Sequence, residues 1–298
     1  MKQDFAVEET IKARSSVRTY DSTPLTQQEE QLLKEYMPKI KNPFGVTVKF
    51  ALLQTDATGK AEKPGTYGII KGAATYLGAF TSAGPLAAEG LGYSFEQLLL
   101  FASSLGLGTC WLGGTFQHSR FARAMQVPAD AYFPAVSPVG HPLGKRRVFE
   151  NLSRWAIHAN GRKSWAVLFF DQDFSTPLTP QAAGEFAAPL EMLRLAPSAI
   201  NRQPWCVLKD HDAFHFFKAC TAAKAEEDTS LGLDLGIAAC HFALEAAEKG
   251  LPGHFEKLTA PGITAPNTLT YTFSWVLQET PAQPVIPKVI HGGYTASP

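Results

Sequence analysis

The pentapeptide STPLT occurs twice in this sequence, at residues 22–26 and again at residues 175–179. Thr26 and Glu29 have the spacing of a capping box, so a helix is expected to begin after the first copy. After the second copy, Thr179 can cap a helix whose first position is a proline. Two identical segments half a chain apart, each followed by a helix signal, indicate two related halves.

Three further elements recur in the same order around these segments. They are a Pro-aromatic pair before a β-branched run, a long apolar helix that ends in Gly-Leu, and an aromatic strand. The copies lie at 43–44 and 204–205, at 106–107 and 250–251, and at 132–136 and 271–276. The offsets drift, from 153 residues for STPLT to 161 for the Pro-aromatic pair and 144 for Gly-Leu, so chance likeness of caps and strands stays the alternative.

The duplication predicts an α+β fold of two tandem related halves, residues 1–160 and 161–298. Each half is expected to place helices around a mixed, mostly antiparallel sheet. The proline-rich stretch from Thr280 to the last residue is expected to be an extended arm of the second half. The first residues predict a short amphipathic helix and not a signal peptide.

Composition excludes several classes of protein. Lys plus Arg and Asp plus Glu number 27 each, with a net charge of +0, so no overall field would attract nucleic acid or an anionic membrane. The four cysteines form no CxxC pair, which favours a reducing compartment. Residues 97–119 contain no charged residue, but their glycines and hydroxyls favour a buried helix followed by a loop over a membrane span. We expect a cytoplasmic protein.

Common catalytic motifs are absent: there is no GxSxG, no GxxxxGK[ST] and no HExxH. A dinucleotide fingerprint starting at Gly106 fails, because Trp111 takes the place of its third glycine. His211 and His215 have the i, i+4 spacing of a metal pair but lack a third ligand in register. We interpret residues 210–217 as the start of a capped helix.

Four polar segments with loop character remain. The first two are Arg14–Arg18, whose guanidinium and hydroxyl groups suit a phosphate, and Thr109–Gly114 (TCWLGG), whose flat ring and glycines suit a planar ligand. The others are the basic cluster Lys145, Arg146 and Arg147, and the polar loop Pro197–Trp205 (PSAINRQPW). Taken singly, each segment has a plain alternative. The two cationic segments could be solvated basic patches, and TCWLGG could be a buried Trp beside a turn. The polar loop could be a turn stabilised by Asn and Ser.

Together the four segments resemble the nitroreductase-like flavoprotein family, whose members bind FMN and take electrons from NADH or NADPH. Leu105–Gly114 (LGLGTCWLGG) and Pro197–Trp205 (PSAxNxQPW) match the family patterns, and Arg14–Arg18 matches an RRSxR-like segment in which Ser15 replaces the second basic residue. The PSAxNxQPW segment usually follows the Arg-rich segment by a few tens of residues, but here it follows by about 180. The resemblance implies the branch of the family in which two halves are fused into an internal pseudo-dimer with one complete site.

The resemblance also implies which residues bind FMN. The phosphate and ribityl chain would be held by Arg14, Ser16, Lys145 and Arg147, with Arg18 near the N1 and O2 atoms of the ring. Backbone groups of Leu112 to Gly114 would meet N5 and O4, and Ser198, Asn201 and Gln203 would complete the pocket from the second half. The full implied set is Arg14, Ser15, Ser16, Arg18, Trp111, Leu112, Gly113, Gly114, Lys145, Arg147, Pro197, Ser198, Ala199, Asn201 and Gln203.

The implied activity is that of an FMN-dependent NAD(P)H oxidoreductase that reduces nitro, quinone or related small acceptors, with the chemistry borne by the flavin and no catalytic side chain. The alternatives are a flavin-binding protein for storage or sensing, without turnover, and a duplicated remnant that binds nothing. The expected partner is a small-molecule electron acceptor, and the chain is expected to be a monomer, with further dimerisation open. The acceptor and the preference between NADH and NADPH are not determined by the sequence.

Overall fold

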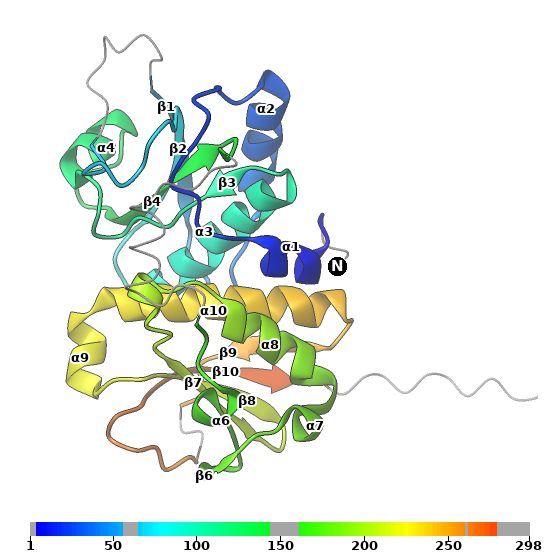
Figure 1. Cartoon of the computed structure of the whole chain (residues 1–298). Coiled ribbons are helices and arrows are strands. Elements are labelled where there is room, and N and C mark those ends of the chain that lie inside the picture. The colour runs from blue at the N-terminus through cyan, green and yellow to red at the C-terminus, as the bar shows by residue number, and fades with distance from the viewer. Residues whose placement is uncertain (1–3, 56–64, 144–160, 260–261, 279–298) are drawn as a thin grey trace, which may run out of the picture.

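The computed structural model describes residues 4–55, 65–143, 161–259 and 262–278. The basic cluster at 145–147, the predicted boundary at residue 160 and the predicted arm after residue 280 lie outside these residues. Two sheets enclose two long helices, α3 and α10, in layers of sheet, helix, helix and sheet (Figure 1).

The elements before residue 144 form the first sheet and its helices. They are α1 (Val7–Ala13), α2 (Gln27–Tyr36), η1 (Met37–Lys39), β1 (Lys49–Gln54), β2 (Thr75–Thr81), α3 (Ala87–Ser104), β3 (Gly108–Thr109), α4 (His118–Ala124) and β4 (Tyr132–Gly140). The strand order is β1-β2-β4-β3, and the neighbouring strands all run antiparallel.

The elements after residue 160 form the second sheet and its helices. They are α6 (Trp165–Leu168), β5 (Phe169–Asp171), β6 (Asp173–Pro177), α7 (Pro180–Ala183), η2 (Gly184–Phe186), α8 (Ala187–Leu195), η3 (Ala199–Asn201), β7 (Trp205–Asp210), β8 (Ala213–Lys218), α9 (Ala222–Glu227), α10 (Thr229–Glu248), β9 (Gly253–Glu256) and β10 (Thr270–Leu277). The order is β6-β5-β7-β8-β10-β9, with β5 and β7 parallel and the other pairs antiparallel. The expectation of an α+β fold with a mixed, mostly antiparallel sheet is confirmed.

The two sheets share one connectivity. The order β7-β8-β10-β9 repeats the order β1-β2-β4-β3, and in each sheet the long helix follows the second strand and precedes the short edge strand. Both long helices end at a glycine in the left-handed region, Gly106 at φ +80° and Gly250 at φ +70°. In both, the N–H of the following leucine donates to the carbonyl five residues back, at 3.1 and 2.8 Å. The predicted Gly-Leu helix ends are therefore confirmed.

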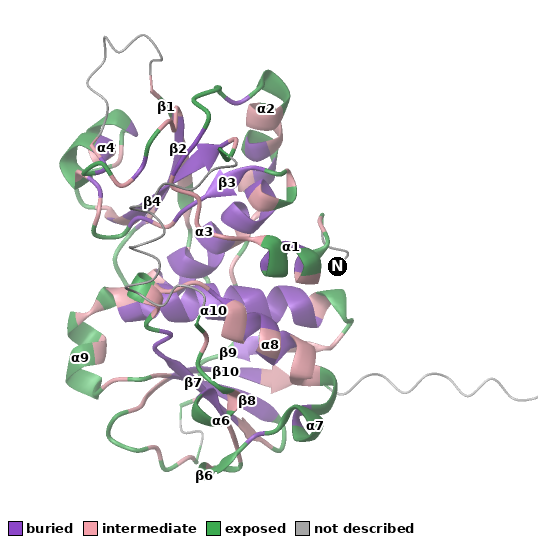
Figure 2. Cartoon of the chain, viewed as in Figure 1, coloured by how far each residue is buried: buried purple, intermediate pink, exposed green. Residues whose placement is uncertain are grey.

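Helices α3 and α10 cross at close range through glycines. A Cβ on Gly92 would lie 2.3 Å from the carbonyl oxygen of Leu233, and a Cβ on Gly236 would lie 2.1 Å from that of Glu89. Each glycine and each contacted residue has its counterpart 144 residues away (89 to 233, 92 to 236), so the contact is reciprocal. This is the pattern of an isologous interface around a local two-fold axis. Figure 2 shows both helices almost entirely buried.

The helix starts agree only in part with the repeat of STPLT. The capping box at Thr26 and Glu29 is present, and Thr179 caps α7 by accepting from the N–H of Ala182 at 3.2 Å. However, α7 has only 4 residues, and the longer helix of this region, α8, begins at Ala187. The second STPLT therefore starts a single turn and not the counterpart of α2.

The helix predicted over residues 210–217 is wrong. These residues form the turn and second strand of the β7–β8 hairpin. Phe214 and Phe216 pack in the core below α10, whereas His215 and Phe217 lie on the opposite face of the sheet. The described residues contain no group of three metal-ligating side chains, so the His211 and His215 spacing has no metal site around it there.

The buried helix predicted within residues 97–119 is α3, which begins ten residues earlier, at Ala87. Among the described helices, α10 is the one that is long and apolar enough to cross a membrane. Its most apolar stretch is 89% buried inside the fold, so packing against α3 and the second sheet accounts for its composition.

Candidate functional site

The Arg-rich segment, Arg14–Arg18, runs beside the glycine-rich segment, Leu105–Gly114. Ser16 forms a parallel bridge with Thr109 of β3, and the N–H of Val17 donates to the carbonyl of Thr109 at 2.8 Å. Gly108 is needed for this approach, because a Cβ there would lie 2.9 Å from the Val17 side chain. The structure thus brings together the first two sequence motifs, about 90 residues apart in the chain.

The guanidinium groups of Arg14 and Arg18 in this segment are not fully hydrogen-bonded. The Arg14 side chain is only 7% exposed, and its Nε lies 3.9 Å from a carboxylate oxygen of Glu96, beyond hydrogen-bond distance. Nε of Arg14 and Nη1 of Arg18 are buried and have no hydrogen-bond partner within the described part of the chain. Buried donors of this kind are usually paired, so they are suited to an anionic ligand.

A surface cavity of about 340 Å³ lies next to Arg14. Arg14 and Ser15 line it together with the backbone turn at Gly106–Gly108 that ends α3. Ser15, Ser16 and Arg18 are half-buried. The hollow therefore combines a cation, a hydroxyl and glycine backbone, which is the donor set expected for a phosphate group.

The TCWLGG segment divides into a buried part and an exposed part. The indole N–H of Trp111 donates to Glu96 at 2.5 Å, and the ring packs edge-on against Phe95 with centroids 4.9 Å apart. Leu112 exchanges backbone hydrogen bonds with Val136 at 2.9 and 3.1 Å, so its N–H is used within the sheet. Gly113 and Gly114 are exposed, with open space where a side chain would stand. They are the backbone of this segment that a planar ligand can approach.

The PSAINRQPW loop contains three residues in the left-handed region: Ile200, Asn201 and Gln203, with φ of 48°, 57° and 49°. Such conformations cost free energy in non-glycine residues and cluster at functional sites. The hydroxyl of Ser198 holds the loop by accepting from the N–H of Gln203 at 2.8 Å. Pro197 and Ser198 are half-buried, and Ala199 and Ile200 are exposed.

A buried carboxyl group supports this loop from α10. The N–H of Ala199 donates to Asp234 at 3.0 Å. Asp234 is 3% exposed, and burial raises its pKa to about 7, although the hydrogen bond from Ala199 acts in the opposite direction. The loop therefore rests on a carboxyl group that titrates near neutral pH.

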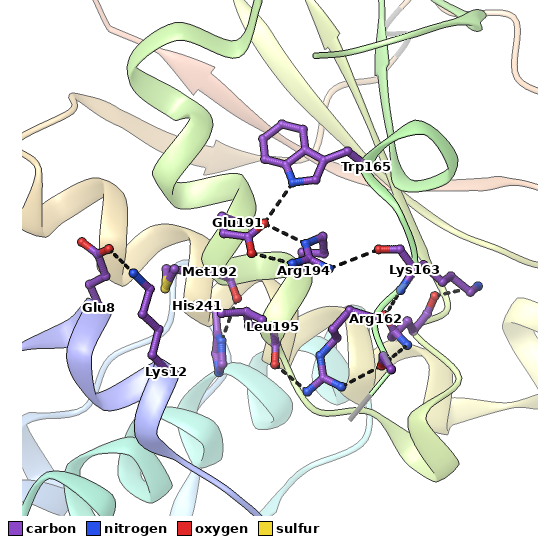
Figure 3. Close-up of polar contacts among 12 residues, drawn as sticks. Glu8, Lys12, Arg162, Lys163, Trp165, Glu191, Met192, Arg194, Leu195 and His241 are labelled. Carbon is purple, nitrogen blue, oxygen red and sulfur yellow. Dashed lines mark hydrogen bonds and ion pairs between the residues drawn. The ribbon is translucent and has the colours of Figure 1, made fainter. Parts of the chain in front are cut away.

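The side-chain amides of Asn201 and Gln203 bind residues 161–163. Asn201 donates to the carbonyl of Gly161 at 2.9 Å and accepts from Arg162 at 3.1 Å, while Gln203 accepts from the N–H of Lys163 at 2.8 Å. Figure 3 shows Arg162 also reaching the carbonyl of Leu195, at 3.1 Å, at the end of α8. These hydrogen bonds keep the PSAINRQPW loop beside residues 161–163.

The Arg-rich segment and the PSAINRQPW loop are connected through helices. Arg14 directly follows α1 and Pro197 closely follows α8, and α1 packs against both α8 and α10. The carboxylate of Glu248, the last residue of α10, accepts from the N–H groups of Val7 and Glu8 at 2.8 and 3.2 Å and so caps α1. A helix of the first sheet region is thereby docked on the helices of the second.

Sequence reasoning missed two residues of this region, Glu96 of α3 and His241 of α10. Both are wholly buried, and Glu96 Oε1 lies 2.9 Å from His241 Nε2. The available signal was a charged or titratable residue inside an otherwise apolar helix, which needs a buried partner.

Comparisons with known proteins identify the class to which this arrangement belongs. Residues 6–246 match the sequence profile of a family described as "Putative TM nitroreductase". The chain therefore belongs to this nitroreductase family. A search of curated proteins gives no match.

Solved structures include several that are similar to this chain. A "putative nitroreductase" from Thermotoga maritima has a TM-score of 0.57 and 20% identity, covering 93% of this chain and 96% of that one, which shows a shared fold. An FMN-dependent nitroreductase from Clostridium difficile has a TM-score of 0.39 and 16% identity, over 46% of this chain and 88% of that one. A "putative NADH dehydrogenase/NAD(P)H nitroreductase" from Bacteroides thetaiotaomicron has a TM-score of 0.39 and 19% identity, over 49% and 91%.

Proposed function

We propose that the protein is an FMN-dependent NAD(P)H oxidoreductase of the nitroreductase type, reducing nitro, quinone or related small electron acceptors. Family membership supports the oxidoreductase class. The observation that carries the FMN assignment is the pair of buried guanidinium donors, Arg14 Nε and Arg18 Nη1, beside the glycine-rich segment. A phosphate and a flavin ring would supply the charge and the acceptors that these groups lack.

The residues present fit FMN in the following roles. Arg14 and Ser16, with Lys145 and Arg147 from outside the described residues, would hold the phosphate and ribityl chain. The exposed backbone of Gly113 and Gly114 would meet one edge of the ring. Bound FMN supplies hydride transfer at its N5 atom, and the protein orients the ring and limits access to it.

We also propose that the chain is a tandem duplication, with halves near 1–160 and 161–298, that forms an internal pseudo-dimer with one site. The shared strand order and the reciprocal crossing of α3 and α10 support this proposal. We use the word seam for the contact region between the two proposed halves on either side of the local two-fold axis. In the seam opposite the candidate site, Phe44 packs against Phe255 and Phe273 with ring centroids 5.6 and 4.7 Å apart. Aromatic packing there leaves one seam for a cofactor. A cytoplasmic monomer acting on a small-molecule acceptor fits this picture.

The test is the flavin content and the redox response of the purified protein. We expect a yellow protein that releases about one FMN per chain, is bleached by NADH or NADPH without oxygen, and regains its colour when a nitroaromatic or quinone is added. Two flavins per chain, or FAD, would contradict the single FMN site. A yellow protein that neither cofactor bleaches would be a flavin store or sensor, and a colourless protein that binds no added FMN would be a remnant.

A further inference from the structure

Glu96 lies next to both the Arg-rich segment and the TCWLGG segment of the candidate site. Its side chain is wholly buried on α3, at the interface with α10. One carboxylate oxygen accepts the indole N–H of Trp111 at 2.5 Å, and the other lies 3.9 Å from Nε of Arg14. A single buried carboxyl group thus contacts Trp111 of the TCWLGG segment and faces Arg14 of the Arg-rich segment.

His241 extends this contact to α8, the helix that precedes the PSAINRQPW loop. Its Nδ1 lies 3.0 Å from the carbonyl oxygen of Met192 in α8, five residues before Pro197 (Figure 3). A carbonyl oxygen can only accept, so Nδ1 donates there. Nε2 faces Glu96 at 2.9 Å, and one proton lies between these two atoms. The result is a buried chain of contacts from Trp111 through Glu96 and His241 to Met192.

The chain of contacts occurs on one side of the local two-fold axis. At the spacing of 144 residues that relates α3 to α10, Glu96 corresponds to Cys240, His241 to Gln97, and Trp111 to Phe255. The side chain of Phe255 has no N–H to donate, and that of Cys240 has no carboxylate to accept a hydrogen bond. The polar network is therefore a feature of the seam that holds the Arg-rich segment, and not of its counterpart.

We propose that Glu96 is a positioning residue for FMN, which fixes Trp111 directly and, through His241, fixes α8 and the loop that follows it. This role rests on the proposed function. The indole N–H of half-buried Trp111 and the imidazole of buried His241 both face this buried carboxyl group, so removing it leaves an indole N–H and an imidazole nitrogen without partners. Relaxation of those groups would displace the TCWLGG and PSAINRQPW segments relative to each other.

The experiment compares Glu96→Leu, Glu96→Gln and Glu245→Leu in the full chain. Glutamine can accept from Trp111 and donate to His241 Nε2, so it retains both hydrogen bonds. Glu245 is the matched control, because it is also wholly buried but has neither motif as a partner. FMN affinity is measured by fluorescence quenching, and the indole N–H proton of Trp111, assigned with Trp111→Phe, is followed by NMR without FMN.

Glu96→Leu is expected to raise the Kd for FMN about tenfold or more and to shift the Trp111 indole resonance, since a lost buried hydrogen bond is worth about that factor. Glu96→Gln is expected to stay within about threefold of wild type, with the resonance unchanged. Glu245→Leu is expected to change the melting temperature alone. His241→Leu, which leaves the contact to Trp111 intact, is expected to weaken FMN severalfold without moving that resonance.

Wild-type FMN affinity in folded Glu96→Leu would overturn the positioning role and leave the proposed function standing. If Glu96→Leu does not fold, unchanged affinity in His241→Leu would overturn the link to α8 and with it the proposal. Wild-type protein that binds no FMN would overturn the proposed function itself.

Discussion

Arg14 carries a guanidinium group that is almost fully buried and only partly hydrogen-bonded at the end of α1. Replacing Arg14 by Ala should weaken FMN binding by about 1.5–3 kcal/mol, the range for a hydrogen bond to a charged group. Lys12→Ala is the control, because Lys12 is a cation two residues away that is 54% exposed and paired with Glu8. Fluorescence titration with FMN measures both, and equal affinities would show that Arg14 does not bind the phosphate.

Asp234 makes the stability of the fold depend on pH. Its pKa is raised from 3.8 to about 7 by burial, so the folded state keeps a proton that the unfolded state has lost between those values. The unfolding free energy should therefore fall as pH rises, by about 2–3 kcal/mol from this group between pH 5 and pH 8, because each pK unit is 1.36 kcal/mol.

Asp234→Asn keeps an acceptor for the N–H of Ala199 but cannot ionise. Urea denaturation should show that the variant is more stable than wild type at pH 8 and that this advantage shrinks towards pH 5. An advantage that is the same at both pH values would mean that Asp234 is already ionised in the folded protein at pH 5.

Two segments that lie side by side in the structure, Arg14–Arg18 and Thr109–Gly114, could be picked out from the sequence because each is short and contiguous. Glu96 and His241 could not, because 145 residues separate two side chains that meet only when α3 crosses α10. The role of Leu112 was also out of reach, since its backbone N–H is used by Val136 of a strand more than 20 residues later.

At the scale of elements, α1 depends on a cap from another helix. Its own N-cap residue, Ala6, offers no side-chain acceptor, and the carboxylate of Glu248 takes that place. Glu248→Ala should lower the unfolding free energy by about 0.5–2 kcal/mol, as other lost N-caps do, and should weaken FMN binding because Arg14 directly follows α1. Glu256→Ala is the control, since that side chain is 54% exposed on β9. Equal melting temperatures for the two variants would show that α1 docks without this cap.

The elements that the sequence predicted best have ends with specific chemistry, such as the capping box at Thr26 and the glycine that ends α10. The β7–β8 hairpin was misassigned for a physical reason. Strand β8 is buried on both faces, with Phe216 on one and Phe217 on the other, so the alternation of polar and apolar residues that identifies a strand is lost. The i, i+4 spacing of His211 and His215 then favoured the prediction of a helix.

At the scale of the whole molecule, the glycines of α3 and α10 set the distance between the two sheets. Gly236→Ala would place a Cβ 2.1 Å from the carbonyl oxygen of Glu89, a backbone atom that cannot rotate away. We expect a loss of about 1–3 kcal/mol in unfolding free energy from this overpacking, and a similar loss for Gly92→Ala. Gly84→Ala, where the added methyl group meets open space, should change stability by less than about 0.5 kcal/mol. Equal denaturation midpoints for all three variants would show that the crossing is not tight.

The crossing of α3 and α10 lies within one polypeptide, so bringing the two sheets together is a step of folding and not of association. Dilution cannot separate them, whereas the same crossing between two chains would weaken as the protein concentration fell. In a homodimer, one substitution changes both sides of such a crossing, whereas here it changes one side alone. Under the proposed duplication, the two sides can therefore change independently, so that one has the arginines and the buried carboxyl group and the other has aromatic rings in the corresponding place.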